Sequence, residues 1–192
     1  MGLLIKDRTL LEPTTTRQLV VKNNKPKIKR IYLDMDGVLC DFEKKYTEFF
    51  GISSKVGGKH SKDFYKRWPI FVQNDLFQYL DWYPGAQRMI EFINNEFVWP
   101  NYGQVCILSS SGGHDTHEKV KRQKIKWLKD HNLWFHPFIV SRKKDKQTYA
   151  SKDMLLIDDA KENIDQFIEA GGHGIHHKDA VDTIKQLEDY IF

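Results

Sequence analysis

The 192-residue sequence has few of the features that mark secreted or membrane proteins. It contains only two cysteines, Cys40 and Cys106, each in an apolar, strand-like stretch. Buried reduced thiols are therefore a better interpretation than a disulfide framework, and they favour a cytoplasmic protein. No run is apolar and long enough to cross a bilayer, and the first residues lack the apolar core of a signal peptide. We expect a cytoplasmic protein with no membrane partner.

Residues 31–192 also lack a net positive charge, although the formal net charge of the whole sequence is +4. Residues 1–30 hold eight Lys and Arg against two Asp and Glu, so residues 31–192 sum to −2. Residues 1–27 show no sustained periodicity and contain coil signals, and we interpret them as a loosely ordered basic arm. Such an arm can contact nucleic acid, but no nucleic-acid-reading module accompanies it. Nucleic acid is therefore not the expected partner.

The chain does contain enough apolar material for a substantial core, with 40% hydrophobic and 29% charged residues. Apolar runs predict strands over residues 27–34, 105–108, 138–140, 154–158 and 174–176. Amphipathic stretches predict helices over residues 84–97, 115–131, 161–170 and 179–190. This alternation predicts an α/β fold, a Rossmann-like parallel sheet with helices on both faces, formed by residues 28–41 and 84–192.

Residues 42–83 interrupt that alternation and predict a small helical cap. Helical patterns over 42–50, 61–68 and 71–80 are joined by a glycine-rich segment, and the whole is far longer than an ordinary strand–helix connection. The segment is also rich in aromatic residues, most of which such a small unit needs for its own core. Four of them are candidates to stack on a base or ring of a ligand: Phe42, Phe64, Tyr65 and Trp68.

Polar side chains follow three of the predicted strands. Asp34 and Asp36 have the i, i+2 spacing that points two side chains to one side of an extended chain. Ser109 and Ser110 follow the second strand, and the pair at 158–159 follows the fourth. Each motif alone is also explained by a solvated turn, an ordinary loop or a helix N-cap. Because the carboxyl ends of parallel strands meet in one crevice, we expect the three groups to converge there.

Several carboxylates in one crevice suit a hard cation such as Mg²⁺, which takes oxygen ligands. Two hydroxyls at the start of a helix supply donors to an oxyanion. The basic segment 142–146 follows the third strand and can bring a lysine over the same point, although a solvated charge run explains it as well. Carboxylates, metal, hydroxyls and lysine together indicate a phosphoryl-transfer site.

The ordered motifs also resemble those of a known family. Segment 34–39, Asp-Met-Asp-Gly-Val-Leu, matches the Asp-x-Asp-Gly-x-[Thr/Val] signature of the haloacid dehalogenase-like (HAD) hydrolases, and segments 105–109 and 155–159 are similar to that family's second and fourth motifs. Within the superfamily, the aromatic insertion and the segment 83–86 resemble the 5′(3′)-deoxyribonucleotidases and related phage or bacterial nucleotidases. The resemblance covers roughly residues 30–176.

The resemblance implies a role for each motif. Asp34 would be the nucleophile that forms an aspartyl-phosphate, and Asp36 the acid and base that serves the leaving group and then the attacking water. The Mg²⁺ ion would lie between the Asp34 carboxylate, the Asp36 main-chain carbonyl and Asp159, with Asp158 beside it.

Phosphate oxygens would be held by Ser109 and the Ser110 main-chain N–H, together with one lysine. Lys146 is our choice for that lysine. Three others also have suitable spacing: Lys143, Lys144 and Lys152.

Two departures from the deoxyribonucleotidase pattern concern the nucleoside. Ala160 stands where an arginine lines the nucleoside site in the mammalian-type enzymes, and Gly113 and His114 occupy the region of a further lysine. The predicted function is a Mg²⁺-dependent phosphatase for nucleoside, especially deoxyribonucleoside, monophosphates. Phosphatases for sugar phosphates or nucleic-acid ends and a non-catalytic phosphate-binding module remain alternatives. The oligomeric state is open, a homodimer included.

Overall fold

The protein is described by a computed structural model over residues 28–57 and 59–192, so the predicted basic arm at 1–27 lies outside the described residues. The strands are β1 (Arg30–Leu33), β2 (Lys55–Val56), β3 (Lys59–His60), β4 (Gln104–Ser110), β5 (His136–Val140), β6 (Met154–Asp158) and β7 (His173–His176). The α-helices are α1 (Phe42–Phe50), α2 (Lys62–Gln73), α3 (Ala86–Ile93), α4 (His117–Asp130), α5 (Lys161–Glu169) and α6 (Ala180–Ile191). The remaining turns are two 3₁₀-helices, η1 (Leu76–Tyr79) and η3 (Lys143–Tyr149), and one π-helical turn, η2 (Asn94–Val98).

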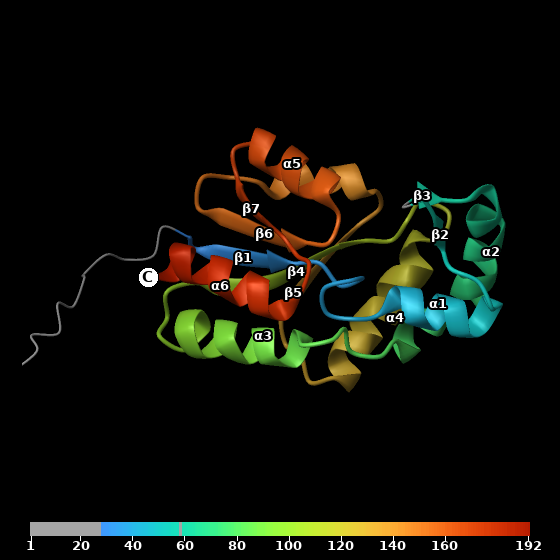
Figure 1. The fold of residues 1–192 in the computed structure, drawn as a ribbon, viewed down its shortest axis with the longest axis horizontal. Helices are drawn as coiled ribbons and strands as arrows, with labels where there is room; N and C mark the ends of the chain where they lie inside the picture. The colour runs from blue at the N-terminus through green and yellow to red at the C-terminus, as the bar shows by residue number, and fades with distance from the viewer. Residues whose placement is uncertain (1–27, 58) are drawn as a thin grey trace, which may run out of the picture.

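Five of the strands form a parallel sheet in the order β5-β4-β1-β6-β7. The central strand β1 alternates between two cores, because Ile31 and Leu33 pack into one apolar cluster and Tyr32 into the other. Helices α3 and α6 cover the first face and α5 the second (Figure 1). Both faces are thus buried, and the predicted parallel α/β sheet with helices on both faces is confirmed.

Strand β4 is longer than its apolar run predicted. The sequence marked residues 105–108, whereas the strand continues through Ser109 and Ser110, which pair with Ile139 and Val140 of β5. Main-chain pairing with the neighbouring strand extends β4 beyond the point where its side chains stop being apolar. As a result, the two serines are held by the sheet and not by a loop.

Helix α2 corrects the prediction of two helices over 61–68 and 71–80. It runs without a break through Pro69, and η1 follows only after Asp75, which adopts a left-handed conformation (φ 55°). Pro69 and Tyr65 are both exposed, so water can bond the Tyr65 carbonyl that the proline leaves without a donor. The buried stripe through Phe64 and Phe71 therefore continues across the proline.

The predicted helix over 84–97 is also divided in the structure. Helix α3 ends at Ile93, and the chain continues as the wider π-helical turn η2. Phe97 is nevertheless fully buried in the core, as the apolar pattern predicted. Among the described residues, no helix combines the length and apolarity needed to span a membrane.

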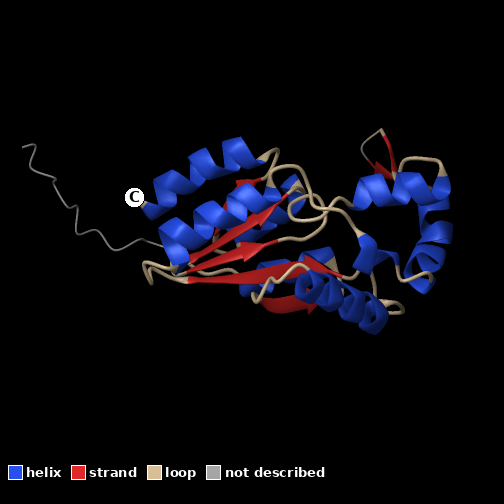
Figure 2. Ribbon diagram, turned by 90° about the horizontal axis from the view of Figure 1, so that it is seen from below, coloured by secondary structure: helices blue, strands red, loops and turns tan. Residues whose placement is uncertain are grey.

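The inserted segment 42–83 lies at the end of the sheet to which the strands point (Figures 1 and 2). Its helices α1 and α2 pack around an aromatic cluster that includes Phe42, Tyr46, Phe71 and Phe77. The buried amide of Gln123, on α4, donates to the Val72 carbonyl (2.8 Å) and accepts from the Phe77 N–H (3.2 Å). The insertion is therefore anchored to the side of the sheet domain as well as joined to it by the chain.

Candidate active site

The loop after β1 is tightly turned because the Met35 carbonyl accepts hydrogen bonds from three successive N–H groups, those of residues 38–40. Gly37 is required in it for two reasons. Its φ of 77° is left-handed, and a Cβ there would come within 2.7 Å of an Asp159 carboxylate oxygen. The glycine thus lets the carboxylate that follows β6 approach the loop that follows β1.

Asp34 stands where β1 ends and is almost fully buried. Its N–H donates to the Ile157 carbonyl (2.9 Å), its Oδ1 accepts from the Met35 N–H (2.8 Å), and its Oδ2 lies 2.9 Å from the Lys146 ammonium. Burial alone would raise the pKa of Asp34, but the charges of Lys146 and Lys124 outweigh it and hold the pKa below its usual value. The carboxylate is therefore ionised.

Asp158 and Asp159 lie at the end of the neighbouring strand β6. Asp158 is fully buried and receives only donors: the Ala160 N–H (2.9 Å), the Asn163 amide (2.9 Å) and the Lys146 ammonium (2.6 Å). Burial, reinforced by the charge of Asp34, raises the pKa of Asp158 above its usual value against the opposing charge of Lys146. These contacts make Asp158 the anchor of Lys146.

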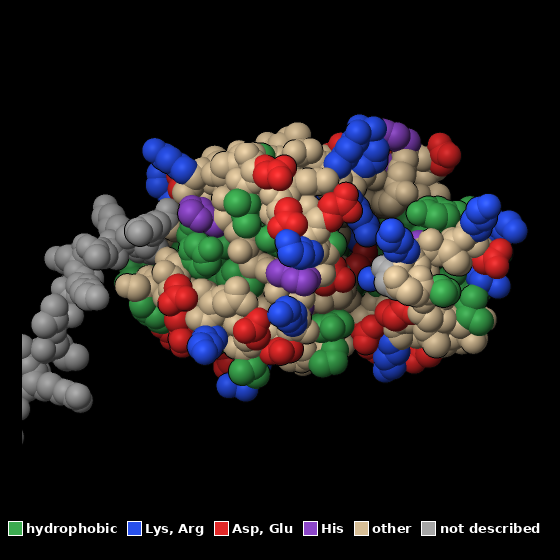
Figure 3. Space-filling model, turned by 45° about the horizontal axis from the view of Figure 1, so that its top comes forward, with side chains coloured by type: hydrophobic (Ala, Val, Ile, Leu, Met, Phe, Trp, Pro, Cys, Tyr) green, Lys and Arg blue, Asp and Glu red, His purple; other side chains and the backbone are tan. Residues whose placement is uncertain are grey.

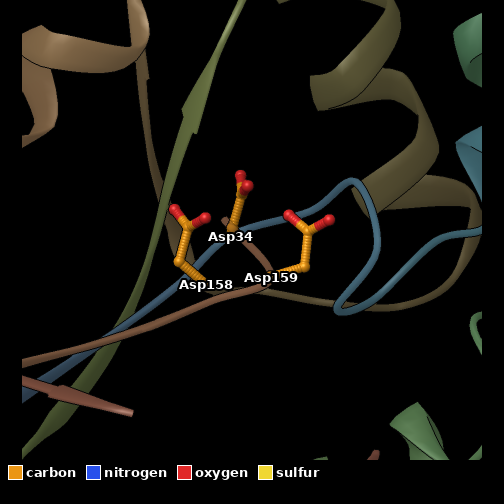
Figure 4. A group of neighbouring side chains, drawn as sticks. All are labelled: Asp34, Asp158 and Asp159. Carbon is orange, nitrogen blue, oxygen red and sulfur yellow. The ribbon is translucent and has the colours of Figure 1, made fainter. Parts of the chain in front are cut away.

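Carboxylate oxygens of Asp34, Asp158 and Asp159 all lie within 4.8 Å of one another, and the three side chains converge in Figure 4. Burial, together with the charges of Asp34 and Asp158, raises the pKa of Asp159 to about 7. A bound cation would offset the repulsion among these three carboxylates, and an all-oxygen donor set suits a hard ion such as Mg²⁺. The residues present therefore fit a metal site, and the predicted contribution of the Asp36 main-chain carbonyl stays a prediction.

Lys146, on η3, is the lysine that reaches the carboxylates. It bridges Asp34 and Asp158 and has a side chain only 1% exposed. Burial would lower the pKa of Lys146, but the two carboxylates raise it well above its usual value, so the ammonium stays charged. The other candidates are exposed: Lys143 lines the outer part of the pocket, and neither Lys144 nor Lys152 contacts the three carboxylates.

A second buried lysine, Lys124 on α4, was missed by the sequence reasoning. Its ammonium donates to Asp36 Oδ2 (2.7 Å), to the Ser109 hydroxyl (2.8 Å) and to the Ser110 carbonyl (3.0 Å). A helix this rich in lysine is usually interpreted as having a solvated face. Lys124 in fact lies on the buried stripe with Val120, Trp127 and Leu128, and a lysine at that spacing was the available signal.

Asp36 is held on both carboxylate oxygens. Lys124 binds Oδ2, and the Cys40 thiol lies 3.7 Å from Oδ1. Burial, reinforced by the charge of Asp36, raises the pKa of Cys40 well above its usual value, so the thiol keeps its proton and can donate it weakly. The Asp36 carboxylate is thus engaged by Lys124 and Cys40 and does not belong to the group formed by Asp34, Asp158 and Asp159.

The loop after β4 is fixed from both sides. Ser109 is fully buried against Lys124, and the Ser111 hydroxyl contacts His117 Nδ1 at 2.8 Å. On the outer side Trp68, from the insertion, donates its indole N–H to the Thr116 hydroxyl (3.0 Å). The same ring lies against Gly112 (φ 78°), where an added Cβ would come within 2.6 Å of it. Ser110, half-buried between these contacts, faces the pocket.

A pocket of about 530 Å³ lies between the strand ends and the insertion, within the size range of small-molecule sites. Figure 3 shows acidic and basic side chains bordering a hollow in this part of the surface. All four aromatic residues proposed from the sequence line the pocket: Phe42, Phe64, Tyr65 and Trp68. Phe42, Phe64 and Trp68 also pack on other aromatic rings of the insertion, so they belong to its core as well as to the pocket wall, and their stacking on a ligand stays a prediction.

Comparison with solved structures finds similar folds at low sequence identity. A haloacid dehalogenase-like family hydrolase from Xanthomonas campestris aligns with a TM-score of 0.57 and 13% identity, covering 88% of this chain and 94% of the other. A hydrolase from Streptococcus pneumoniae aligns with a TM-score of 0.52 and 15% identity, covering 84% and 99%. The protein has the fold of the haloacid dehalogenase-like hydrolases.

A further HAD-fold neighbour is the Bacillus subtilis protein YfnB, named as a HAD-hydrolase and bound to magnesium. It aligns with a TM-score of 0.50 and 12% identity, covering 86% of this chain and 99% of the other. No protein-family model and no curated protein matches the sequence. The resemblance to this superfamily stated from the motifs is therefore confirmed for the fold, and the nucleotidase resemblance stays a prediction.

Proposed function

We propose that the protein is a Mg²⁺-dependent phosphatase that hydrolyses nucleoside monophosphates, deoxyribonucleoside monophosphates in particular, through an aspartyl-phosphate. The proposal rests chiefly on one observation. A nucleophilic carboxylate, Asp34, is held ionised by Lys146, while a second carboxylate, Asp36, is oriented separately by Lys124. Two carboxylates in distinct environments are what a nucleophile and its acid–base partner require.

The proposed reaction has two steps. Asp34 attacks phosphorus, the bond from phosphorus to the ester oxygen breaks, and Asp36 gives its proton to the departing alkoxide. Asp36 then takes a proton from water, the resulting hydroxide attacks phosphorus, and inorganic phosphate leaves while Asp34 is regenerated. Asp36 is thereby returned to its protonated form, so protons and charge balance over the cycle.

The other residues of the site hold charge and geometry. Asp34, Asp158 and Asp159 would hold Mg²⁺, which supplies positive charge against the negative phosphate. Lys146 fixes the Asp34 carboxylate, and Lys124 fixes both Asp36 and the Ser109 hydroxyl. Ser110 faces the pocket at the end of β4, where its main-chain N–H and hydroxyl would bind phosphate oxygens.

The substrate assignment rests on the walls of the pocket. The insertion 42–83 would serve as a cap on a domain made of residues 28–41 and 84–192, and it contributes aromatic rings that suit a planar base better than a sugar alone. Two buried free cysteines support a reducing, cytoplasmic location.

A substrate screen tests the proposal. Nucleoside 5′- and 3′-monophosphates and several sugar phosphates are incubated with the protein and Mg²⁺, and released phosphate is measured. We expect release from at least one nucleoside monophosphate, its loss in Asp34→Asn, and its loss on chelation of the metal. Release from sugar phosphates alone would overturn the nucleotide assignment, and release that persists in Asp34→Asn would overturn the mechanism.

A further inference from the structure

Charge is separated by depth within the pocket. All its acidic lining residues are buried or half-buried: Asp34, Asp36, Asp41, Glu43 and Asp159. All its exposed charged lining residues are basic, namely Lys55, Arg142 and Lys143, and we call these three the rim. The rim comes from two distant parts of the chain, strand β2 of the insertion and the segment that leads into η3.

The deep carboxylates already have partners of their own. Asp36 binds Lys124, Asp41 accepts the Lys44 N–H as the N-cap of α1, and Glu43 accepts from Ser53 and Ser54. Asp34 and Asp159 belong to the proposed metal site. The acidic residues of the pocket therefore do not serve as ion-pair partners of the three rim cations.

Two of the three rim cations have no ion-pair partner within the part of the chain that the structure describes. Arg142 is bound to Asp145 through its guanidinium. No carboxylate among residues 28–57 and 59–192 lies within 4.0 Å of the Lys55 or Lys143 ammonium. The insertion and the sheet domain thus each present one unpaired lysine at the same opening.

The charges of both lysines act on the same ring. His60 stacks on Phe64 with a centroid separation of 3.8 Å, and burial together with the charges of Lys143 and Lys55 lowers the pKa of His60. The ring is therefore neutral, and the two ammonium groups near it repel each other. The charge of Lys55 also acts on Glu43 and Asp159, but neither carboxylate lies within ion-pair distance of it. An anion placed between them would remove that repulsion.

We infer that the rim binds a second phosphate of the substrate, so that the preferred substrate is a nucleoside bisphosphate and not a monophosphate. This inference rests on the proposed function. The scissile phosphate would be held at the inner end of the pocket by Ser110 and the metal site, so the rim cations are available for another anionic group. A pocket of about 530 Å³ has room for more than one phosphate.

The first test compares two substrates with the wild-type protein and Mg²⁺. The best nucleoside 5′-monophosphate of the screen is compared with its 3′,5′-bisphosphate, with adenosine as the starting case. We expect kcat/KM to be about tenfold or more higher for the bisphosphate, through a lower KM, and the preference to shrink at high ionic strength. Equal or lower kcat/KM for the bisphosphate overturns the inference, whereas monophosphate hydrolysis that requires Asp34 still supports the proposed function.

The second test removes one rim charge at a time. Lys143→Gln is expected to reduce kcat/KM for the bisphosphate about tenfold and that for the monophosphate less than threefold, mainly through KM. Lys144→Gln is the matched control, because Lys144 is an exposed neighbour that does not line the pocket. Lys55→Gln should act in the same direction, although Lys55 also lowers the pKa of Asp159 and is the less selective probe.

Equal losses for both substrates in Lys143→Gln, or an equal loss in Lys144→Gln, would show general attraction of anions and overturn the inference. A 5′-phosphorylated oligonucleotide forms the last arm. If it is hydrolysed with a higher kcat/KM than the bisphosphate, the rim is a nucleic-acid contact, and the small-molecule assignment is wrong.

Discussion

The floor and the rim of the pocket differ in how their charges are held. The floor consists of Asp34, Asp36, Ser109, Lys124, Lys146, Asp158 and Asp159. Its two lysines are each 1% exposed and each contact at least two partners, whereas the rim lysines are exposed and unpaired among the described residues. A buried network is costly to alter and suits chemistry that must not change. An exposed rim can change charge at little cost to the fold, and so suits substrate selection.

The largest effect is expected from Lys146→Met, which cuts the floor network at its centre. Asp34 and Asp158 would face each other without the cation that bridges them. We expect the free energy of unfolding to fall by about 3–5 kcal/mol and phosphate release to fall at least about 100-fold. Urea denaturation and initial rates measure the two effects.

Lys144→Met is the control for this variant, because Lys144 is exposed and should change either quantity little. If Lys146→Met keeps wild-type stability, the Lys146 ammonium is not needed to offset the charges of the buried carboxylates. The contrast between floor and rim is then wrong.

The next effect concerns Asp159 and the metal. Because burial and its acidic neighbours raise the pKa of Asp159 to about 7 in the folded protein, the unfolded state loses this proton first as pH rises. The stabilisation that comes from the proton bound at Asp159 is complete at low pH, below the pKa of this group in the unfolded state, and is lost as pH rises towards about 7. In the absence of metal, the loss of this stabilisation lowers the free energy of unfolding by about 3–4 kcal/mol over that interval.

Denaturation at pH 5 and pH 8 with a chelator, with and without the substitution Asp159→Asn, measures this contribution. The variant should lose less stability than the wild type as pH rises. Adding Mg²⁺ should stabilise the wild type more at pH 8 than at pH 5, since the metal competes with the proton. The same pH dependence in Asp159→Asn would show that another group causes it.

Lys124→Met tests the part of the floor that holds Asp36. Loss of the ammonium frees the Asp36 carboxylate and the Ser109 hydroxyl, and we expect kcat to fall about 10²–10³-fold with a smaller change in KM. Stability should fall by less than about 3 kcal/mol, because Asp36 is half-exposed and can rehydrate. Steady-state kinetics measure the changes in kcat and KM.

The matched control for this helix is Lys126→Met, which removes only an exposed ion pair with Asp130. An unchanged kcat in Lys124→Met would contradict the positioning of Asp36 by this lysine.

The smallest effect is expected at the wall between floor and rim. Trp68→Phe keeps an aromatic ring but removes the indole N–H that binds the Thr116 hydroxyl. We expect a stability loss of about 1 kcal/mol and a few-fold rise in KM with kcat nearly unchanged, because the loop after β4 loses one outer support. A fall in kcat comparable to that of Lys124→Met would mean that the wall takes part in the chemistry.

Strand ends could be read from the sequence because they follow local rules. Apolar runs that end in Asp34 and Asp158 mark where two parallel strands stop, and parallel strands place those ends side by side. The choice of Lys146 among four lysines could not be made from spacing alone. It depends on how η3 lies over β6, which brings one ammonium within 2.6 Å of Asp158.

Lys124 is a residue whose burial the sequence did not predict. A helix rich in lysine is usually a solvated face, and the other lysines of α4 are indeed partly or fully exposed. This one is buried because Asp36 and Ser109, far away in the sequence, supply the partners that make a buried charge tolerable. Helical periodicity marks the position, but only the packed fold shows the partners.

The sequence by itself determined the alternation of strands and helices, the parallel sheet and the carboxylates at the ends of its strands, because these depend on neighbours within a few residues. Only the tertiary structure decided which lysines enter the floor, how Trp68 meets the loop after β4, and which charges remain at the rim. Those outcomes depend on electrostatic and packing partners, most of them far apart in the chain: Lys124 and Asp36 are 88 residues apart, and Trp68 and Thr116 are 48 residues apart. Local sequence patterns contain no information about contacts between residues that are far apart in the chain.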